Sequence, residues 1–162
     1  MNILVLCTGN SARSILLEYI LRTRSNGRVT SFSAGSKPAG KVHPQSVALL
    51  ASLGIDTSDA RSKSWDEFGA EDAPQMDAVI TVCGSAAGEE CPIWPAGPNG
   101  APARAHWGVE DPAAAAEPDW EAAFQTAYDI LGRRADAFLS MDVDPTDRAA
   151  LQAALNSAGQ VQ

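Results

Sequence analysis

Apolar and polar positions follow two different periods along this chain, and the periods predict strands and helices in turn. The apolar run NILVL at residues 2–6 is typical of a short strand that is covered on both faces. Residues 28–35 alternate like a second strand, MDAVITVC at 76–83 predicts a third, and ARAHW at 103–107 a short fourth.

The segments between and after these strands have the spacing of helices. Apolar positions three and four apart, with turn residues at the ends, predict helices from residue 11 to about 24, over 43–54, from 118 to about 139 and from 146 to about 157. This alternation favours an α/β fold, with a parallel sheet covered by helices on both faces.

One segment, residues 84–102, fits neither period. It holds four prolines and four glycines, which exclude a helix and a central strand, and it carries Cys91. Structureless segments of this length inside a compact domain are typically functional or disordered.

The composition narrows the classes of partner. The chain has 162 residues, 45% of them apolar and 20% charged, with a net charge of −8, as expected of one globular domain. The negative charge argues against nucleic acid or an anionic membrane as the main partner, but not against a small anion bound by local N–H groups. No run reaches the roughly 18 apolar residues that a membrane span requires, and the start lacks a basic signal, so we expect a cytoplasmic protein.

The stretch CTGNSARS at residues 7–14 is the strongest candidate for chemistry. It follows a buried strand and opens a helix, so its backbone N–H groups would converge on one point at the positive end of the helix dipole. Arg13 could add a forked pair of N–H bonds to an oxyanion, and Cys7 would then be a thiolate near neutral pH. The predicted oxyanion-binding residues are Thr8, Gly9, Asn10, Ser11, Ala12, Arg13 and Ser14.

The alternative is purely structural. A lone cysteine at a strand end is commonly a small buried apolar residue, and an arginine in a first helical turn is commonly on the surface. The complete pattern of strand, C-x5-R and helix favours the oxyanion site.

These residues, together with SAG at 33–35, ITVC at 80–83, CPI at 91–93 and HWGVEDPA at 106–113, resemble the low-molecular-weight protein tyrosine phosphatase family. Within that family they are more similar to the thioredoxin-coupled arsenate reductases. The resemblance spans residues 1 to about 139. It implies a three-layer fold with a four-stranded parallel sheet, and it leaves the last helix as an extra element. We therefore expect a reductase domain at 1–140 and a helical extension at 141–162 packed on it.

The resemblance also implies roles for distant residues. Cys7 would be the nucleophile, Asp111 the general acid, Cys83 the thiol that resolves the arsenic adduct, and Cys91 the thiol that carries the disulfide outward. Other interpretations remain for these residues. Asp111 precedes a proline and could simply form a turn. The two later cysteines could be incidental, or could bind zinc together with His106.

Substrate and reductant follow from the same comparison. Where the phosphatases usually have Asp-Pro-Tyr, this chain has Asp111, Pro112 and Ala113, which favours a small inorganic anion over a phosphotyrosine. Arsenate is the expected substrate, and phosphate or sulfate could occupy the same loop. Thioredoxin is the expected reductant and glutathione with glutaredoxin the alternative, whereas a phosphatase acting through a cysteinyl-phosphate is the alternative function.

Loop support is expected from Asn10 and Ser33. Some relatives organise these residues and a glutamate, here Glu18, around a potassium ion, but the position of a further aspartate is taken here by Lys63, whose ammonium could replace the ion. We therefore predict no bound metal and no cofactor. The alternative for Glu18 and Lys63 is a solvated pair on the surface.

Overall fold

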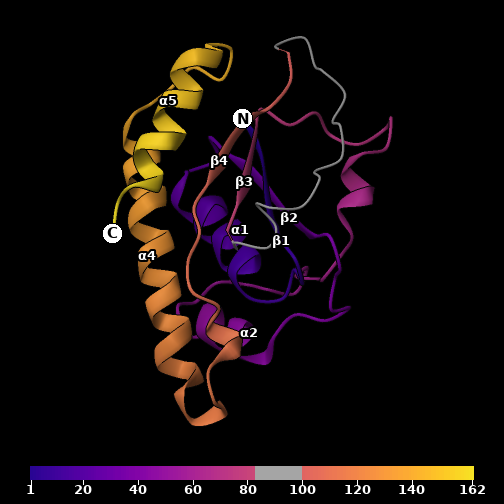
Figure 1. The fold of residues 1–162 in the computed structure, drawn as a ribbon, viewed down its shortest axis with the longest axis vertical. Coiled ribbons are helices and arrows are strands. Elements are labelled where there is room, and N and C mark those ends of the chain that lie inside the picture. Colours follow the sequence, from indigo (N-terminus) through magenta and orange to yellow (C-terminus); the bar gives the residue numbers. More distant parts are fainter. Residues whose placement is uncertain (83–99) are drawn as a thin grey trace.

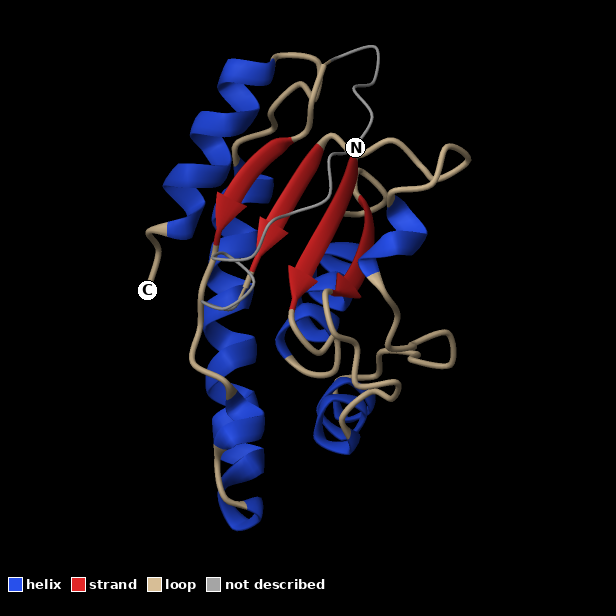
Figure 2. Ribbon diagram, turned by 45° about the vertical axis from the view of Figure 1, so that its right-hand side comes forward, coloured by secondary structure: helices blue, strands red, loops and turns tan. Residues whose placement is uncertain are grey.

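Four parallel strands form the centre of the fold. The computed structural model describes residues 1–82 and 100–162, and in them β1 (Asn2–Cys7), β2 (Thr30–Gly35), β3 (Ala78–Thr81) and β4 (Ala103–His106) pair in the order β2-β1-β3-β4. Figure 2 shows all four arrows pointing the same way. The predicted α/β fold with a four-stranded parallel sheet is confirmed.

The helices begin and end within about two residues of the predicted positions. The described α-helices are α1 (Arg13–Arg24), α2 (Pro44–Ser52), α4 (Trp120–Ser140) and α5 (Arg148–Gly159), and the short 3-10 helices are η1 (Trp65–Phe68), η2 (Pro112–Ala114) and η3 (Glu117–Asp119). In the part of the chain that the structure describes, none of the helices combines the length and apolar character that a membrane crossing requires.

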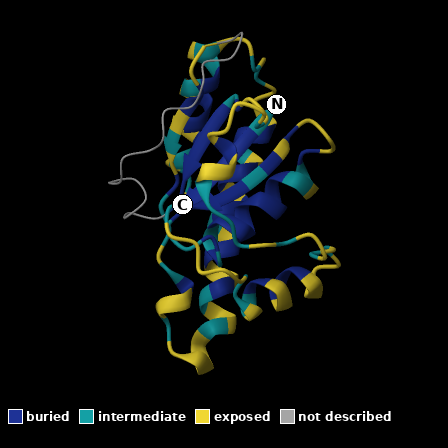
Figure 3. Ribbon diagram, turned by 90° about the vertical axis from the view of Figure 1, so that its right-hand side faces the viewer, coloured by how far each residue is buried: buried dark blue, intermediate teal, exposed yellow. Residues whose placement is uncertain are grey.

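Alternate residues of β1 point to opposite faces of the sheet, and each face has its own apolar cluster. Ile3 and Val5 are fully buried in the larger cluster, which α1, α4 and α5 cover. Leu4 and Leu6 belong to a smaller cluster on the other face, where the described covering helix is η1. The two central strands, β1 and β3, are buried over nearly all of their length, which explains their continuous apolar runs in the sequence, whereas the edge strand β4 is largely exposed; Figure 3 shows the buried centre in dark blue.

The strand order places a topological switch point at the end of β1. From β1 the chain crosses to β2 on one side, whereas β3 pairs with the other side. In open parallel sheets the crevice at the carboxyl ends of such strands is where ligands bind. Cys7 is the last residue of β1 and therefore lies at this crevice.

The last helix, α5, lies along the edge strand β4, and both Figures 1 and 2 show it running beside that strand. Leu151 and Leu155 are fully buried in the larger cluster. The Gln152 side chain accepts from the Arg104 N–H at 3.0 Å and donates to the Arg104 carbonyl at 2.6 Å, so it takes the place of a neighbouring strand. The domain boundary at residue 140 stays a prediction.

Candidate active site

The loop of residues 7–14, called here the cradle loop, turns its carbonyl groups outward. The Cys7, Thr8 and Gly9 carbonyls accept from the N–H groups of residues 36, 37 and 39 at 3.3, 2.9 and 2.9 Å. The Ser11 carbonyl accepts from the His43 N–H and the Ser46 hydroxyl, both at 3.0 Å. Since a peptide's N–H points opposite to its C=O, outward carbonyls leave the N–H groups on the inner side, as an oxyanion site requires.

The start of α1 favours the same function. Its N-cap is Ala12, whose side chain makes no capping hydrogen bond to the first N–H groups. Serine, threonine, aspartate or asparagine usually fills this position and accepts from the first N–H groups. With alanine there, the positive end of the helix is available to an anion from outside the chain.

The sulfur of Cys7 lies on the floor of the cradle loop and is only 5% exposed. The Asn10 N–H donates to it at 3.3 Å, and the Ser14 hydroxyl oxygen lies 3.3 Å away. The Ser14 hydroxyl already accepts from the Asn10 side-chain amide at 3.0 Å, so its own proton is directed to the sulfur. Two donors facing one sulfur stabilise a thiolate over a thiol.

Asn10 lies at the centre of a hydrogen-bond network behind the cradle loop. It is fully buried, and its backbone has a φ of 45°. Its amide nitrogen donates to Ser14 and, at 2.9 Å, to Ser33, while its amide oxygen accepts from the Lys63 N–H at 2.9 Å. Gly35 lets the end of β2 lie close against the cradle loop, because a Cβ at position 35 would lie 2.5 Å from the Thr8 carbonyl oxygen.

Arg13 connects the cradle loop to the segment that carries Asp111. Its guanidinium donates to the Val109 carbonyl at 3.0 Å and lies 3.4 Å from the Asp111 carboxylate. The Arg13 side chain is 13% exposed and that of Asp111 44%. The structure thus brings these two predicted residues together, 98 positions apart in the sequence.

The carboxylate of Asp111 also caps η2 by accepting from the Ala113 N–H at 3.2 Å. The turn-forming role that the Asp-Pro sequence predicts is therefore present, and it coexists with the contact to Arg13. The two oxygens of this carboxylate therefore have different partners, the Ala113 N–H at Oδ1 and the Arg13 guanidinium at Oδ2.

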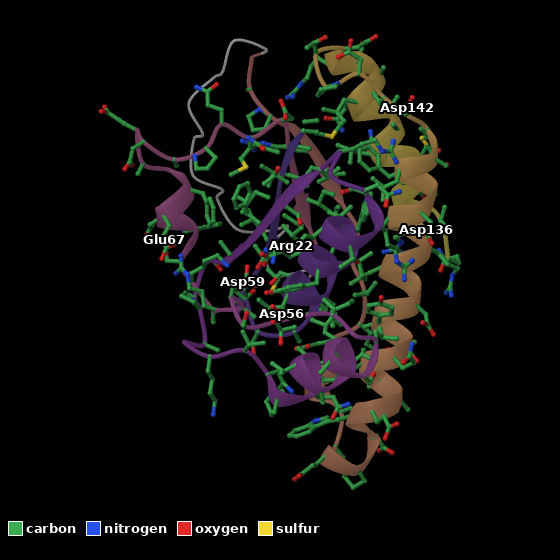
Figure 4. The ribbon with its side chains drawn as sticks, turned by 180° about the vertical axis from the view of Figure 1, so that it is seen from behind. Arg22, Asp56, Asp59, Glu67, Asp136 and Asp142 are labelled. Carbon is green, nitrogen blue, oxygen red and sulfur yellow. The ribbon has the colours of Figure 1, made fainter. Side chains whose placement is uncertain are left out.

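A polar cluster lies on the outer side of this network. Ser33 donates to the carboxylate of Glu18, which also binds Arg22 at 2.7 Å. Arg22 in turn binds Asp59 at 2.8 Å, and Figure 4 shows these two side chains meeting. Burial raises the pKa of Glu18 and lowers the pKa of Lys63.

This cluster corrects one alternative from the sequence. Glu18 is only 6% exposed, so a solvated surface pair of Glu18 and Lys63 is wrong. The reason is that Ser33 and Arg22 come together over Glu18 from β2 and from the next helical turn.

The two histidines are structural. His43 accepts from the Gln45 N–H and caps α2, and its ring packs between Trp120 and Phe124 at 4.6 and 4.8 Å. His106 shares a 2.8 Å hydrogen bond with Thr81.

Within residues 1–82 and 100–162 there is no group of three or more histidine, cysteine and acidic side chains placed to hold a metal ion. Cys83 and Cys91 lie outside the described residues, so their predicted roles remain predictions.

One residue that the sequence did not single out, Arg134, contacts the segment around Asp111 by donating to the Gly108 carbonyl. Within that segment, Trp107 donates through its indole to the Leu155 carbonyl. The available signal for Arg134 was an arginine beside the apolar face of a predicted helix.

Comparison with known proteins agrees with this geometry. The arsenate reductase of Halalkalibacterium halodurans is 36% identical over 135 residues, which are 82% of this chain and 91% of that protein. The arsenate reductase of Bacillus subtilis is 35% identical over 136 residues, with the same coverage of both chains. A solved structure of an arsenate reductase in the phosphate-binding state superposes with a TM-score of 0.66 and 26% identity, covering 88% of this chain and 98% of that one.

The family model described as low molecular weight phosphotyrosine protein phosphatase matches residues 2–153. The match includes the cradle loop, the segment with Asp111 and the first turns of α5. This chain belongs to the low molecular weight phosphotyrosine protein phosphatase family.

Proposed function

We propose that this protein reduces arsenate to arsenite and so contributes to arsenic detoxification. The observation that carries the proposal is the cradle loop itself: outward carbonyls, an uncapped helix start, Arg13 at the rim and the Cys7 sulfur on the floor. This arrangement suits a tetrahedral oxyanion of the size of arsenate. The relatives named arsenate reductase support the choice within the family.

In the first step the Cys7 thiolate attacks arsenic(V). The N–H groups of residues 8–14 and the Arg13 guanidinium would bind the arsenate oxygens, and Ser14 would stabilise the sulfur until it reacts. One As–OH group leaves as water, its proton coming from Asp111, and a bond between sulfur and arsenic forms.

In the next steps two electrons pass from thiols to arsenic. Cys83 attacks the Cys7 sulfur, the electron pair of the S–As bond goes to arsenic, and arsenite leaves with arsenic(III). This yields a Cys7–Cys83 disulfide. Cys91 then attacks Cys83, which frees Cys7 and leaves a Cys83–Cys91 disulfide for an external dithiol to reduce.

A small substrate is supported by the residues around Asp111. Ala113 and Ala114 follow Pro112 in η2, so η2 itself provides no aromatic ring to stack on a phosphotyrosine. Phosphate has nearly the same shape as arsenate, and the cradle has little means to reject it. Slow hydrolysis of aryl phosphates is therefore an expected side reaction, and phosphatase activity is the second candidate function, which the family relation favours.

Thioredoxin is the reductant that we propose, because an internal disulfide is the ordinary substrate of a dithiol protein, with glutathione and glutaredoxin as the alternative. The relay needs three reduced thiols at the start of each cycle, which fits a reducing compartment such as the cytoplasm.

The test compares the wild type with Cys83→Ser in two assays. The first follows NADPH oxidation that depends on arsenate, with thioredoxin and thioredoxin reductase present. The second follows hydrolysis of an aryl phosphate. We expect turnover of arsenate by the wild type, loss of at least about 100-fold in Cys83→Ser, and aryl phosphate hydrolysis within about twofold in both.

Fast aryl phosphate hydrolysis without arsenate turnover under any thiol system would overturn the proposal and leave a phosphatase. Replacing thioredoxin by glutathione and glutaredoxin in the same assay decides between the two reductants.

A further inference from the structure

The segment of residues 107–112, called here the acid loop, follows β4 and includes Asp111. Long-range contacts bind several of its positions. The Trp107 N–H donates to the Thr81 carbonyl at 2.7 Å, and the Val109 N–H to the Val82 carbonyl at 3.1 Å. Among residues 1–82 and 100–162, the other long-range hydrogen bonds and ion pairs of the acid loop join it to Arg13 of α1, Arg134 of α4 and Leu155 of α5.

α5 and the residues after it follow β4 toward the acid loop. Gln152 pairs with Arg104 at the strand, and one turn later the Leu155 carbonyl accepts from the Trp107 indole at 2.9 Å. Near its end, Gly159 packs so tightly on the Trp107 ring that a Cβ would lie 2.8 Å from it. Trp107 itself is fully buried.

Arg134 of α4 joins the C-terminal residues to the acid loop. Its Nε donates to the Val161 carbonyl at 2.8 Å and its Nη1 to the Gly108 carbonyl at 3.1 Å. The residue is only 6% exposed, and among the described residues no carboxylate pairs with it. A buried guanidinium that binds only backbone carbonyls fixes those carbonyls in place, since each bond to a charged donor is stronger than a neutral one.

We propose that the C-terminal segment from α5 to Val161 is a clamp on the acid loop, and that Arg134 and Trp107 are positioning residues for Asp111. This inference rests on the proposed function, in which Asp111 gives its proton to the leaving group. The clamp holds Trp107 and Gly108, and Arg13 holds the two later positions, Val109 and Asp111. The acid is thus fixed between the cradle loop on one side and the C-terminal residues on the other.

The family match reaches only partly into the clamp. The family model matches residues 2–153, which include the acid loop and the first residues of α5, whereas the clamp continues to Val161.

The chain offers a matched pair of variants for the test. Arg134→Met removes the two bonds that Arg134 makes, to Val161 and Gly108, whereas Arg133→Met removes a neighbouring arginine whose hydrogen bond goes to the Gln162 carbonyl at 2.6 Å. Arg134→Lys keeps the charge but cannot bridge two carbonyls as a guanidinium does. Trp107→Phe keeps the ring in the core and removes the donor to Leu155.

Two readouts are needed. Hydrogen exchange of the 107–113 peptide reports how firmly the acid loop is held, and it does not depend on any reaction. Values of kcat/KM for a series of aryl phosphates, with leaving groups of rising pKa, report whether the acid is in place. Arsenate turnover in the coupled assay is measured beside them.

We expect Arg134→Met and Trp107→Phe to speed exchange in the acid loop by about tenfold or more and to lower kcat/KM about 10- to 100-fold for the poorest leaving group. The loss shrinks for activated leaving groups, which need no proton, and arsenate turnover falls with it. Arg134→Lys restores little of it, and Arg133→Met matches the wild type in both readouts.

Equal exchange in Arg134→Met and Arg133→Met would overturn the clamp. Faster exchange with an unchanged dependence on the leaving group, or with unchanged arsenate turnover, would overturn the positioning role. A wild type that turns over neither arsenate nor aryl phosphates would refute the proposed function and, with it, the role for Asp111, while the exchange data would still decide whether the clamp holds the loop.

Discussion

The carboxyl ends of β1 and β4 both deliver residues to the candidate site, but they are held in different ways. The cradle loop after β1 is dense: Cys7, Asn10 and Ser14 are almost fully buried and bind one another. The acid loop after β4 ends in an aspartate that is 44% exposed and is held by Arg13, Arg134 and the indole of Trp107.

The difference matches the role that we propose for each loop. A nucleophile and its oxyanion donors need fixed geometry before the anion arrives, so that no reorganisation is needed during the reaction. An acid must meet the leaving group and then admit water and the next substrate. A loop tied at a few long-range points can do both, and its precision then depends on those points.

The largest expected effect comes from the residue shared by the two loops. Arg13→Ala removes the forked donor of the cradle and the two contacts that Arg13 makes to the acid loop, and we expect kcat/KM for arsenate to fall about 1,000-fold. Arg24→Ala is the matched control, because Arg24 lies in the last turn of the same helix and binds Asp136 instead. A loss below tenfold in Arg13→Ala would mean that the backbone alone binds the anion.

Asp111→Asn alters the acid loop after β4 and leaves the cradle loop unchanged. It keeps the shape of the side chain and removes the proton donor, and we expect kcat/KM to fall about 100-fold, with the largest loss for poor leaving groups. Glu110→Gln alters the neighbouring exposed carboxylate and should leave kcat/KM within about twofold. Equal losses in the two variants would contradict the assignment of Asp111.

Asn10→Gly weakens the cradle loop after β1 without removing its anion-binding groups. Glycine accepts the φ of 45°, so the variant loses the side-chain bonds to Ser14, Ser33 and the Lys63 N–H without adding strain. We expect the free energy of unfolding to fall by about 2–3 kcal/mol and kcat/KM by about tenfold. Urea denaturation of this variant beside Asn26→Gly, at an exposed turn with a φ of 51°, separates lost hydrogen bonds from backbone effects.

The buried Glu18 behind the cradle loop makes the free energy of unfolding depend on pH. Its pKa is raised by burial, so the folded protein keeps a proton that the unfolded chain loses near pH 4.5. The stabilisation from this group is present below that pH and is lost as the pH rises through the folded value. We expect Glu18→Gln to flatten the fall in unfolding free energy between pH 4.5 and neutral pH.

Asp59 gives the opposite sign in the same cluster. The hydrogen bond from Tyr19 lowers the pKa of Asp59, so the stability that it contributes is present above its ordinary value of 3.8 and is lost as the pH falls. Urea midpoints measured from below pH 3.8 to above pH 4.5 should therefore change with pH in opposite ways. Glu18→Gln removes a stabilisation that declines as the pH rises, whereas Asp59→Asn removes one that declines as the pH falls. A shift of the same sign in both would contradict the burial of Glu18.

The sequence predicted one of the two loops far better than the other, and for a physical reason. The residues that form the cradle loop are at most seven positions apart, and its strand, turn and helix are coded locally, although Ser33 and Lys63 also hold Asn10 from 23 and 53 positions away. The acid loop is held by contacts across 96, 48 and 26 positions, which no local pattern encodes. The burial of Glu18 escaped prediction for the same reason, because Ser33 reaches it from another strand.

The most direct test of the account is a single turnover without any external reductant. Fully reduced protein is mixed with excess arsenate, arsenite is quantified, and non-reduced peptides are mapped by mass spectrometry, for the wild type, Cys7→Ser and Cys91→Ser. The account predicts one arsenite per wild-type chain with a Cys83–Cys91 disulfide, none from Cys7→Ser, and one from Cys91→Ser with a Cys7–Cys83 disulfide. Arsenite from Cys7→Ser at the wild-type yield, or none from the wild type, would contradict it.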